Sequence, residues 1–385
     1  MSEDLKRCSR CLLDTTVPGI YFDKDGICQY CYSHDLLTKD YPVDTSQLEN
    51  KRNLLISKIK SEGKNKEYDC IVGVSGGTDS SYTLHLVHEL GLRPLAVHFD
   101  NGWNSNTAVS NIKKLCTKLD VDLFTYVVEW EEFKNIQISF LKASVPCIEA
   151  PTDVGIHGVL MRMASKYGAK YILGGQSFKT EGTVPKPWSY IDGTYIKTIQ
   201  NKFGSVPIKS FPNLSLFQVA WFTFIRGVKQ IPFLNYYDYD KKVAKIFLKE
   251  NYEWEDYSGH HYENIYSKFS FGWYLPKKFN IDKRKVSLSG PVRSSLMSRA
   301  EALELLKIAP QLGDEEDLIQ YTHNKLDLTR KEFDEIMSLP PKWYSDYFTS
   351  DNIIRYLKWP IKLATKMGFL TPVLYEKFLG GSEKK

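Results

Sequence analysis

The chain has 385 residues, 51 of them basic and 46 acidic, and a formal net charge of +5. This length is enough for two or three domains, and 42% hydrophobic with 25% charged residues is ordinary for a globular protein. So small a charge does not favour nucleic acid as a partner. The start is unlike a signal peptide, and the most apolar run, residues 214–225, is too short to span a bilayer and is predicted to be a buried helix. We therefore expect a cytoplasmic protein with no membrane partner.

Four of the seven cysteines lie near the start of the chain in the pattern C-x₂-C-x₁₆-C-x₂-C. Paired C-x₂-C turns at this separation are typical of a tetrahedral Zn²⁺ site in a reducing compartment. Four thiolates leave no open position, so we expect structural Zn²⁺, with an iron–sulfur cluster as the alternative. Residues 1–40 are predicted to form a zinc ribbon and residues 41–66 a linker helix. The predicted ligands are Cys8, Cys11, Cys28 and Cys31.

From residue 67 onward, short apolar segments alternate with helical patterns. Such alternation is typical of an α/β fold with a doubly wound parallel sheet, in which ligands bind at the carboxyl ends of the strands. We predict this domain over residues 67–205 and a mostly helical region over residues 206–385. The predicted strands are residues 69–74, 95–100, 123–128 and 171–174, and the predicted helices are residues 78–90, 107–119, 131–142 and 156–167.

The first strand ends in a Ser-Gly-Gly turn directly before a helix. This arrangement aims backbone N–H groups and the positive helix end at an anion. Asp79 would repel a phosphate, so we assign it to Mg²⁺; the alternative is an acid that interacts with the helix dipole. The S-G-G-x-D-S motif resembles the PP-loop of ATP pyrophosphatases, which split ATP into AMP and pyrophosphate. The ATP ligands predicted here are Val74, Ser75, Gly76, Gly77, Thr78, Asp79 and Ser80.

Two other strand ends are predicted to reach the same edge of the sheet. His98 and Asp100 close the second strand, and Gly175 and Gln176 follow the fourth, so all four are added to the predicted ATP site. Asp100 is the candidate for binding a ribose hydroxyl; the alternative is a turn residue that binds the local backbone. The alternatives for His98 and Gly175 are a half-buried strand residue and an ordinary loop glycine.

Three later features carry further candidates. Residues 176–213 contain no predicted element and are interpreted as a binding loop that brings Glu181 and Trp188 to a substrate, with ordinary loop packing as the alternative. Residues 277–285 hold five basic residues against one acid, which indicates either anion binding or a solvated helix end. Cys147 is a candidate for sulfur transfer or, as a lone cysteine, an ordinary small buried residue.

Together these stretches resemble the N-acetyl sugar amidotransferases, PP-loop enzymes of surface-polysaccharide (lipopolysaccharide, O-antigen) and nonulosonic-acid biosynthesis such as that of pseudaminic acid. The resemblance covers the cysteine ribbon, the PP-loop, Glu181 with Trp188, and the blocks at residues 98–103, 259–263, 275–279 and 282–284. It departs from the family pattern at Thr78 and His260, where the family has lysine.

The resemblance implies ATP- and Mg²⁺-dependent conversion of a sugar acetamido group to an acetamidino group. The amide oxygen is adenylated, pyrophosphate leaves, and ammonia then displaces AMP. Lys283 and Arg284 are candidates for binding the α-phosphate or a sugar carboxylate, and Lys278 for binding the substrate. His261 and Glu263 are candidates for orienting the substrate or moving protons, with structural hydrogen bonding as the alternative.

The ammonia source is inferred from the cysteines. A glutaminase needs an activated cysteine nucleophile, and four cysteines here are assigned to zinc, so we expect ammonia from a separate glutaminase. The alternative functions are tRNA thiolation, which would need a persulfide-carrying cysteine such as Cys147, and a non-catalytic nucleotide-binding module.

Overall fold

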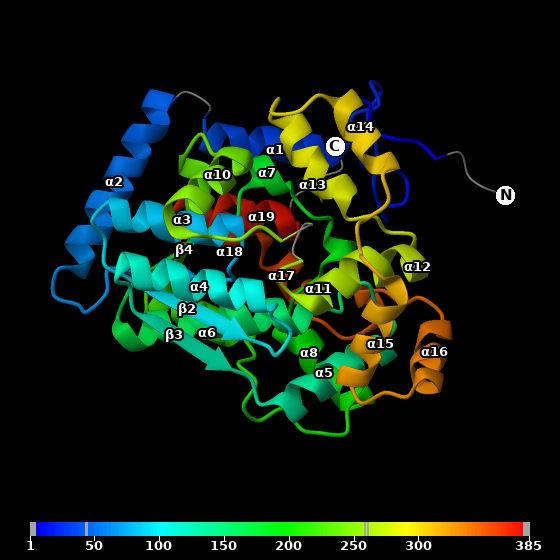
Figure 1. Ribbon diagram of the computed structural model, residues 1–385. Helices are drawn as coiled ribbons and strands as arrows, with labels where there is room; N and C mark the ends of the chain where they lie inside the picture. The colour runs from blue at the N-terminus through cyan, green and yellow to red at the C-terminus, as the bar shows by residue number, and fades with distance from the viewer. Residues whose placement is uncertain (1–4, 43–44, 258, 260–261, 380–385) are drawn as a thin grey trace.

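The computed structural model describes residues 5–42, 45–257, 259 and 262–379. Its centre is a five-stranded parallel sheet in the order β3-β2-β1-β4-β5 (Figure 1). The first four strands lie where the sequence predicts them. The strands are β1 (Cys70–Gly73), β2 (Pro94–Asp100), β3 (Leu123–Val127), β4 (Tyr171–Gly174) and β5 (Lys229–Pro232).

The fifth strand corrects the predicted domain boundary. It pairs in parallel with β4, Tyr171 opposite Lys229, so the sheet continues well past residue 205. This edge strand has the sequence Lys-Gln-Ile-Pro, which lacks the apolar alternation that identifies a strand from sequence.

The sheet is covered on both faces because neighbouring residues of each strand point to opposite sides. Val72 packs in the same cluster as Leu84 and Ile112, whereas Ile71 belongs to the cluster that contains Ile136. The predicted doubly wound α/β fold is therefore confirmed. One face carries α2 (Thr45–Gly63), α3 (Thr78–Glu89), α4 (Asn106–Leu119) and α10 (Lys241–Tyr252), and the other carries α5 (Trp130–Lys142), α6 (Ala150–Tyr167) and α8 (Gly193–Phe203).

Strand order reverses at β1, which has β2 on one side and β4 on the other. In a sheet of this kind the ligand crevice opens at the carboxyl ends of the strands on either side of this point. The end of β4 touches the start of α3, because a Cβ atom on Gly175 would lie 2.8 Å from the backbone of Asp79. Only glycine permits this approach.

The segment of residues 176–213 contains more structure than predicted. It holds α7 (Phe178–Glu181), a 3₁₀ turn at Lys186–Trp188 and the helix α8. Asp192 caps α8 by accepting from Thr194 N, and Ile196 and Ile199 are buried. The flanking glycines and prolines hide this helix in the sequence.

The amino-terminal part is built around the cysteines and α1 (Gln29–Asp40), which begins directly after Cys28. The carboxy-terminal part is mostly helical, and α13 lies beside α1 at the top of the molecule (Figure 1). Its helices are α11 (Ile265–Phe269), α12 (Leu275–Phe279), α13 (Arg284–Arg293), α14 (Arg299–Lys307), α15 (Glu315–Lys325), α16 (Arg330–Ser338), α17 (Asp351–Tyr356), α18 (Lys358–Lys366) and α19 (Pro372–Leu379).

The prediction of a buried helix at residues 214–225 is wrong in part. Helix α9 (Leu216–Ala220) continues into a π-helical turn, Trp221–Ile225, and Val219 and Phe222 pack against the core. Phe217 is 77% exposed, however, because the segment is apolar all round and only one side meets the core. None of the helices in the described ranges is long and apolar enough to cross a membrane.

Candidate functional site

The loop after β1 is shaped by two glycines. Gly76 has φ +79°, and a Cβ atom on it would lie 2.3 Å from the carbonyl oxygen of Ala108 on α4. The Gly76 carbonyl accepts hydrogen bonds from Trp254 Nε1 at 3.0 Å and Asn111 Nδ2 at 3.3 Å. Gly77 is the N-cap of α3 and has no side chain to cap the helix. The uncapped N–H groups of α3 therefore remain at the reversal point of the sheet, where an anion binds favourably.

Two serines close this loop. The Ser75 N–H donates to Ser80 Oγ at 3.1 Å, and Ser80 Oγ donates to the Gly77 carbonyl at 3.2 Å. From the neighbouring strand, His98 Nδ1 donates to the Val74 carbonyl at 2.9 Å, so His98 supports the loop from behind. Burial lowers the pKa of His98, which keeps the imidazole neutral for this role.

Asp79, in the first turn of α3, is held by two residues that the sequence analysis did not identify. Tyr239 donates its hydroxyl hydrogen to Asp79 Oδ1 at 2.5 Å, and Lys241 Nζ donates to Oδ2 at 2.6 Å. Tyr239 lies in the connection between β5 and α10, and Lys241 is the first residue of α10. Strand β5 positions this connection beside the loop that follows β1, and the sequence did not reveal β5.

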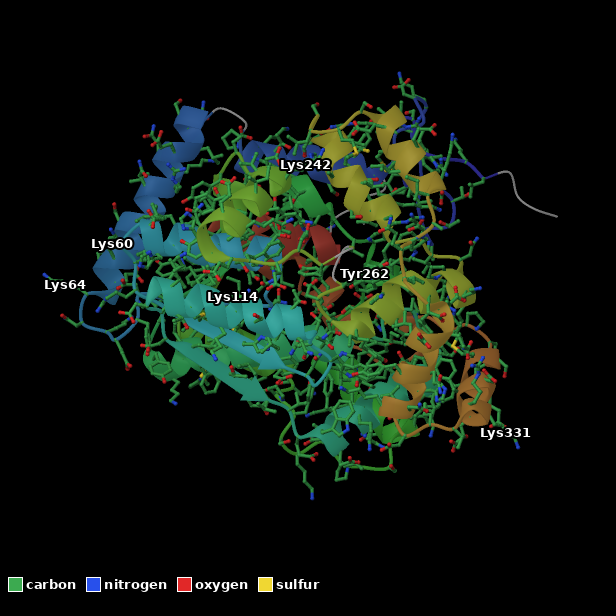
Figure 2. The ribbon with its side chains drawn as sticks, viewed as in Figure 1. Lys60, Lys64, Lys114, Lys242, Tyr262 and Lys331 are labelled. Atoms are coloured by element: carbon green, nitrogen blue, oxygen red, sulfur yellow. The ribbon has the colours of Figure 1, made fainter. Side chains whose placement is uncertain are left out.

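Lys241 lies among three carboxylates. Burial alone would lower its pKa, but the charges of Asp79, Glu181 and Glu263 outweigh burial and raise it. The next residue, Lys242, is exposed and lies at the surface of α10 (Figure 2). The two neighbouring lysines therefore differ: one is directed into the site and the other is solvated.

The segment after α10 covers the loop. A Cβ atom on Gly77 would lie 2.7 Å from the Tyr257 hydroxyl and 3.2 Å from Glu263 Oε1. Burial, together with the charges of Glu263 and Asp79, raises the pKa of Tyr257 and keeps it a hydrogen-bond donor. Three of the predicted site residues, Asp79, Glu181 and Glu263, thus meet at the carboxyl edge of the sheet.

Asp100 makes the local turn that the sequence analysis gave as the alternative. Its Oδ1 accepts from Gly102 N at 2.9 Å and from Asn104 Nδ2 at 3.1 Å, and within the described ranges its Oδ2 has no partner. Beside it is an open pocket of about 310 Å³. The pocket is lined by Asp100, Gly102, Val127, Val128, Trp130 and Lys325.

Other predicted residues are placed elsewhere. Trp188 is 1% exposed and packs in the core. Lys278 donates to the carbonyls of Ile336 and Met337 at the end of α16, and burial lowers its pKa to about 8. Gln176 is exposed just after β4, and His261 lies outside the described residues.

The basic run at residues 277–285 contacts other parts of the protein. Arg284 pairs with Asp282 at 2.7 Å, and Lys285 pairs with the buried Asp14 of the ribbon at 2.7 Å. Lys283 Nζ lies 3.6 Å from the centroid of the Phe271 ring. These contacts with Asp282, Asp14 and the Phe271 ring were not expected from the sequence, which offered anion binding or a solvated helix end.

A buried carboxylic acid missed by sequence reasoning lies at the same edge of the sheet. Glu149 is 8% exposed, precedes α6, and among the described residues its Oε1 has no hydrogen-bond partner. Burial, helped by the charge of Asp153 and opposed by Lys283, raises the pKa of Glu149 to about 8. Such a group exchanges a proton near neutral pH.

The four predicted metal ligands meet in one buried cluster. The Sγ atoms of Cys8, Cys11, Cys28 and Cys31 all lie within 4.8 Å of one another, with Cys11 and Cys28 at 3.6 Å. A tetrahedron with Zn–S bonds of ~2.3 Å has S···S edges of about 3.8 Å, so the cluster has the size for a metal with four thiolate ligands.

Arg293 of α13 is directed at this cluster. Its Nη2 donates to Cys11 Sγ at 3.1 Å and its Nε to Cys31 Sγ at 3.4 Å. A divalent metal with four thiolates carries a net negative charge, which a buried guanidinium compensates. Hydrogen bonds from Cys28 and Cys31, with the charge of Arg293, lower the pKa of Cys11.

Helix α13 also contacts the loop that carries Glu181. A Cβ atom on Gly182 would lie 2.6 Å from the Val286 carbonyl, and Ser294 Oγ donates to the Lys179 carbonyl at 3.3 Å. The same helix therefore contacts the cysteine cluster on one side and the Glu181 loop on the other.

Cys147 has the properties of a core residue. It is 4% exposed, its Sγ lies 3.4 Å from the Tyr195 hydroxyl, and burial raises its pKa to about 11. A thiol that stays protonated is a poor nucleophile. This environment matches the buried-residue alternative.

Comparisons with known proteins are informative in the carboxy-terminal part. Residues 263–361 match a family described as "LPS biosynthesis protein WbpG-like, C-terminal domain". A tRNA-specific 2-thiouridylase, MnmA 2 of Fusobacterium nucleatum, is 28% identical over 29% of this chain and 34% of its own length. A tRNA(Ile)-lysidine synthase of Chlamydia pneumoniae is 34% identical over 16% of this chain and 20% of its own length. The chain thus spans about a third or less of these relatives.

Solved structures give weaker similarity. An NH3-dependent NAD synthetase from Campylobacter jejuni has a TM-score of 0.31 and 14% identity, over 68% of this chain and 96% of that one. The U34-tRNA thiolase NcsA from Methanococcus maripaludis, with a 4Fe-4S cluster, has a TM-score of 0.32 and 12% identity, over 84% and 99%.

The strand order, the Ser-Gly-Gly loop at the reversal point and Asp79 on the following helix give the doubly wound α/β fold and the loop position that the PP-loop resemblance predicts. Residues 263–361 match the model of the WbpG-like carboxy-terminal domain of LPS biosynthesis proteins.

Proposed function

We propose that this protein is an ATP-dependent amidotransferase that converts the acetamido group of a sugar to an acetamidino group, releasing AMP and pyrophosphate. One observation carries the proposal: the WbpG-like domain contributes to the PP-loop site. Glu263, the first residue of that domain, has its Oε1 beside Gly77, and its carbonyl accepts from Ser105 N at 2.8 Å.

The residues at the carboxyl edge fit ATP and Mg²⁺. The glycines leave space where a Cβ atom would otherwise clash, the α3 N-terminus is uncapped, and Asp79, Glu181 and Glu263 supply the oxygen ligands that Mg²⁺ prefers. Bound Mg²⁺ neutralises charge on the departing pyrophosphate. We assign the pocket beside Asp100 to the nucleoside, with the free Oδ2 accepting from a ribose hydroxyl and Trp130 packing on the base.

Lys241 is the cation that we assign to ATP instead of Arg284. In the structure it neutralises Asp79, and when the metal takes over that carboxylate, the ammonium can donate to a phosphate oxygen. The substrate amide oxygen attacks the α-phosphorus, the bond to pyrophosphate breaks, and an adenylated imidate forms. This arrangement stabilises negative charge as it develops on the phosphates.

The second half-reaction requires ammonia and a proton acceptor. Ammonia attacks the imidate carbon, a proton leaves the new nitrogen, and AMP departs with the former amide oxygen. Glu149, with a pKa of about 8, is our candidate for accepting that proton. The ammonia is proposed to come from a separate glutaminase, because all seven cysteines are buried and Cys147 stays protonated.

The test is mass spectrometry of acetamido sugars incubated with the purified chain, ATP, Mg²⁺ and ammonium. We expect the mass loss that corresponds to exchange of oxygen for NH, with one AMP formed per product. ADP instead of AMP, or AMP without any modified sugar in a panel of free and nucleotide-linked acetamido sugars, would contradict the proposal.

The similarity to a 2-thiouridylase favours tRNA thiolation as the second candidate. Thiolation through a persulfide requires an accessible thiolate, whereas Cys147 is buried and hydrogen-bonded to Tyr195. Cys147→Ala should leave AMP formation with the sugar intact and lower stability by about 1 kcal/mol. Thiolated tRNA formed by the wild type and abolished in this variant would favour the second candidate.

A further inference from the structure

The segment of residues 216–225 presents a row of large apolar side chains to solvent. The exposed fractions of Phe217, Trp221, Phe224 and Ile225 are 77, 47, 49 and 65%. Steps of four, three and one residue place them on one side of a helix, while Phe222 packs against the core on the other. An exposed row of this size in a folded protein marks an interaction surface.

Helix α18 presents a second row, and the residues that follow this helix meet the end of the first row. Trp359 and Leu363 are 77 and 59% exposed, and Met367 just after the helix is 61% exposed. The Phe224 ring contacts the Phe369 ring at 5.6 Å between centroids, which brings the ends of the two segments together. We call the combined surface the apolar patch; it consists of Phe217, Trp221, Phe224, Ile225, Trp359, Leu363 and Met367.

The charges on these segments have one sign. Residues 213–237 and 352–375 contain no aspartate or glutamate. Lys229 Nζ lies 5.3 Å from the Phe369 ring centroid, and Lys362 Nζ lies 5.6 Å from the Trp359 ring centroid. Of the nearby acids, Asp351, directly before the second segment, pairs with Arg355 at 2.9 Å, and Glu62 pairs with Lys170. The basic residues of the two segments are Arg226, Lys229, Arg355, Lys358, Lys362 and Lys366.

We propose that the apolar patch docks the protein on the surface of an anionic lipid bilayer. Tryptophan and phenylalanine enter the interfacial region of a bilayer while neighbouring lysine and arginine side chains pair with anionic headgroups. A second copy of the chain fits less well, because a symmetric contact would bring these basic segments face to face. This inference modifies the sequence-based expectation of no membrane partner.

Docking in this way leaves the ATP site open. The Trp221–Ile225 turn leads into the amino-terminal end of β5, and Arg226 donates to the Ser165 carbonyl near the end of α6, just before β4. The loop with Asp79 lies at the carboxyl ends of the strands, the opposite edge of the sheet. The proposal does not depend on the reaction that the site performs.

The test is flotation of the full chain with vesicles of phosphatidylethanolamine and phosphatidylglycerol, compared with vesicles of phosphatidylcholine alone. We expect binding to the anionic vesicles that weakens as salt increases. The double variant Trp221→Ser with Trp359→Ser should bind at least about tenfold more weakly. The matched control is Leu54→Ser with Ile246→Ser, which removes two side chains that are 73 and 58% exposed outside the patch.

Brominated lipids should quench tryptophan fluorescence in the wild type and in the control, and much less in the Trp221/Trp359 variant. Equal binding to both vesicle types, or unchanged binding by the Trp221/Trp359 variant, would overturn the proposal. The proposal would also fail if the wild type bound no vesicles but formed a concentration-dependent dimer that the Trp221/Trp359 variant did not form. That result would assign the patch to contact with a second copy of the chain. Unchanged circular dichroism of both variants shows that the fold is intact.

Discussion

Two regions of the molecule place one cationic side chain against concentrated negative charge, and they differ in their access to solvent. At the cysteine cluster, Arg293 is 5% exposed and the four cysteines are 0% exposed. At the PP-loop, the side chains of Lys241 and Asp79 are 33 and 15% exposed. A closed site with all thiolate ligands in place serves structure, whereas an accessible carboxylate paired with a lysine can exchange its partner for a metal or a nucleotide.

This difference in solvent exposure separates a cation that stabilises a closed cluster from a cation that lies in an accessible site. In the ribbon the cation lies against four buried cysteines, and the helix α13 that carries it also packs against the loop with Glu181. At the PP-loop the cation neutralises a carboxylate that, under the proposed function, would bind Mg²⁺ instead. Variants of each pair should therefore fail in different ways, one in ligand binding and turnover and the other in metal retention and stability.

The largest expected effect is that of Asp79→Asn. Loss of the carboxylate removes the proposed Mg²⁺ ligand, and we expect turnover to fall by about 10²–10³-fold. The unfolding temperature should change little, since an amide can still accept from Tyr239. Asp256→Asn, which alters a surface pair with Lys245, is the control and should remain active. Near-normal pyrophosphate release by Asp79→Asn would refute the metal assignment.

Lys241→Met should weaken ATP binding by about 10-fold to 100-fold, because a charge-assisted contact to a phosphate is lost. Binding of a fluorescent ATP analogue measures this without requiring turnover. Lys242→Met is the matched control, since that side chain is exposed on the same helix. If both variants bind the analogue equally well, Lys241 serves only to neutralise Asp79.

Arg293→Met should lower stability by about 3–5 kcal/mol, because the cluster's charge remains buried without its partner. Bound zinc, measured by a colorimetric chelator, should be released faster than from the wild type. Arg299→Met is the comparison, since Arg299 donates only to the carbonyls of Cys8 and Cys11. Removing the metal from the wild type with a chelator should cause the same loss of stability. If Arg293→Met and Arg299→Met retain the metal equally well, Arg293 does not support the cluster.

The last expected effect is a pH dependence of stability due to Glu149. Its pKa is raised from 4.5 to about 8, so the neutral acid stabilises the fold fully below pH 4.5 and this contribution is lost as the pH rises through 8. Glu149→Gln removes this loss. The stability of the variant relative to wild type should therefore rise between pH 4.5 and 8 by up to about 5 kcal/mol, and the difference in unfolding temperature should rise with it. If Glu149 also accepts the proton released when ammonia attacks the imidate, the pH dependence of kcat due to Glu149 should disappear in the variant. A difference in unfolding temperature that does not change with pH would contradict the raised pKa.

The sequence by itself determined the cysteine cluster, the Ser-Gly-Gly loop and four of the five strands. These features depend on local rules: the spacing of thiols on tight turns, a strand that ends in glycines before a helix, and apolar alternation. The irregular loop after the fourth strand suggested Glu181, and the family resemblance added Glu263. Both lie close enough to Lys241 at Asp79 for their charges to raise its pKa. Their roles in catalysis remain predictions.

Only the tertiary structure decided what surrounds those motifs. The short edge strand β5, which has no sequence signature, positions Tyr239 and Lys241 at Asp79. Lys283 and Arg284 resemble anion ligands in the sequence, yet Arg284 pairs with Asp282 and the neighbouring Lys285 with Asp14. Residues 214–225 are apolar enough to be buried, yet four of their side chains face solvent. In each case the outcome depends on which distant segment packs alongside, and the periodicity of one segment carries no information about its neighbours.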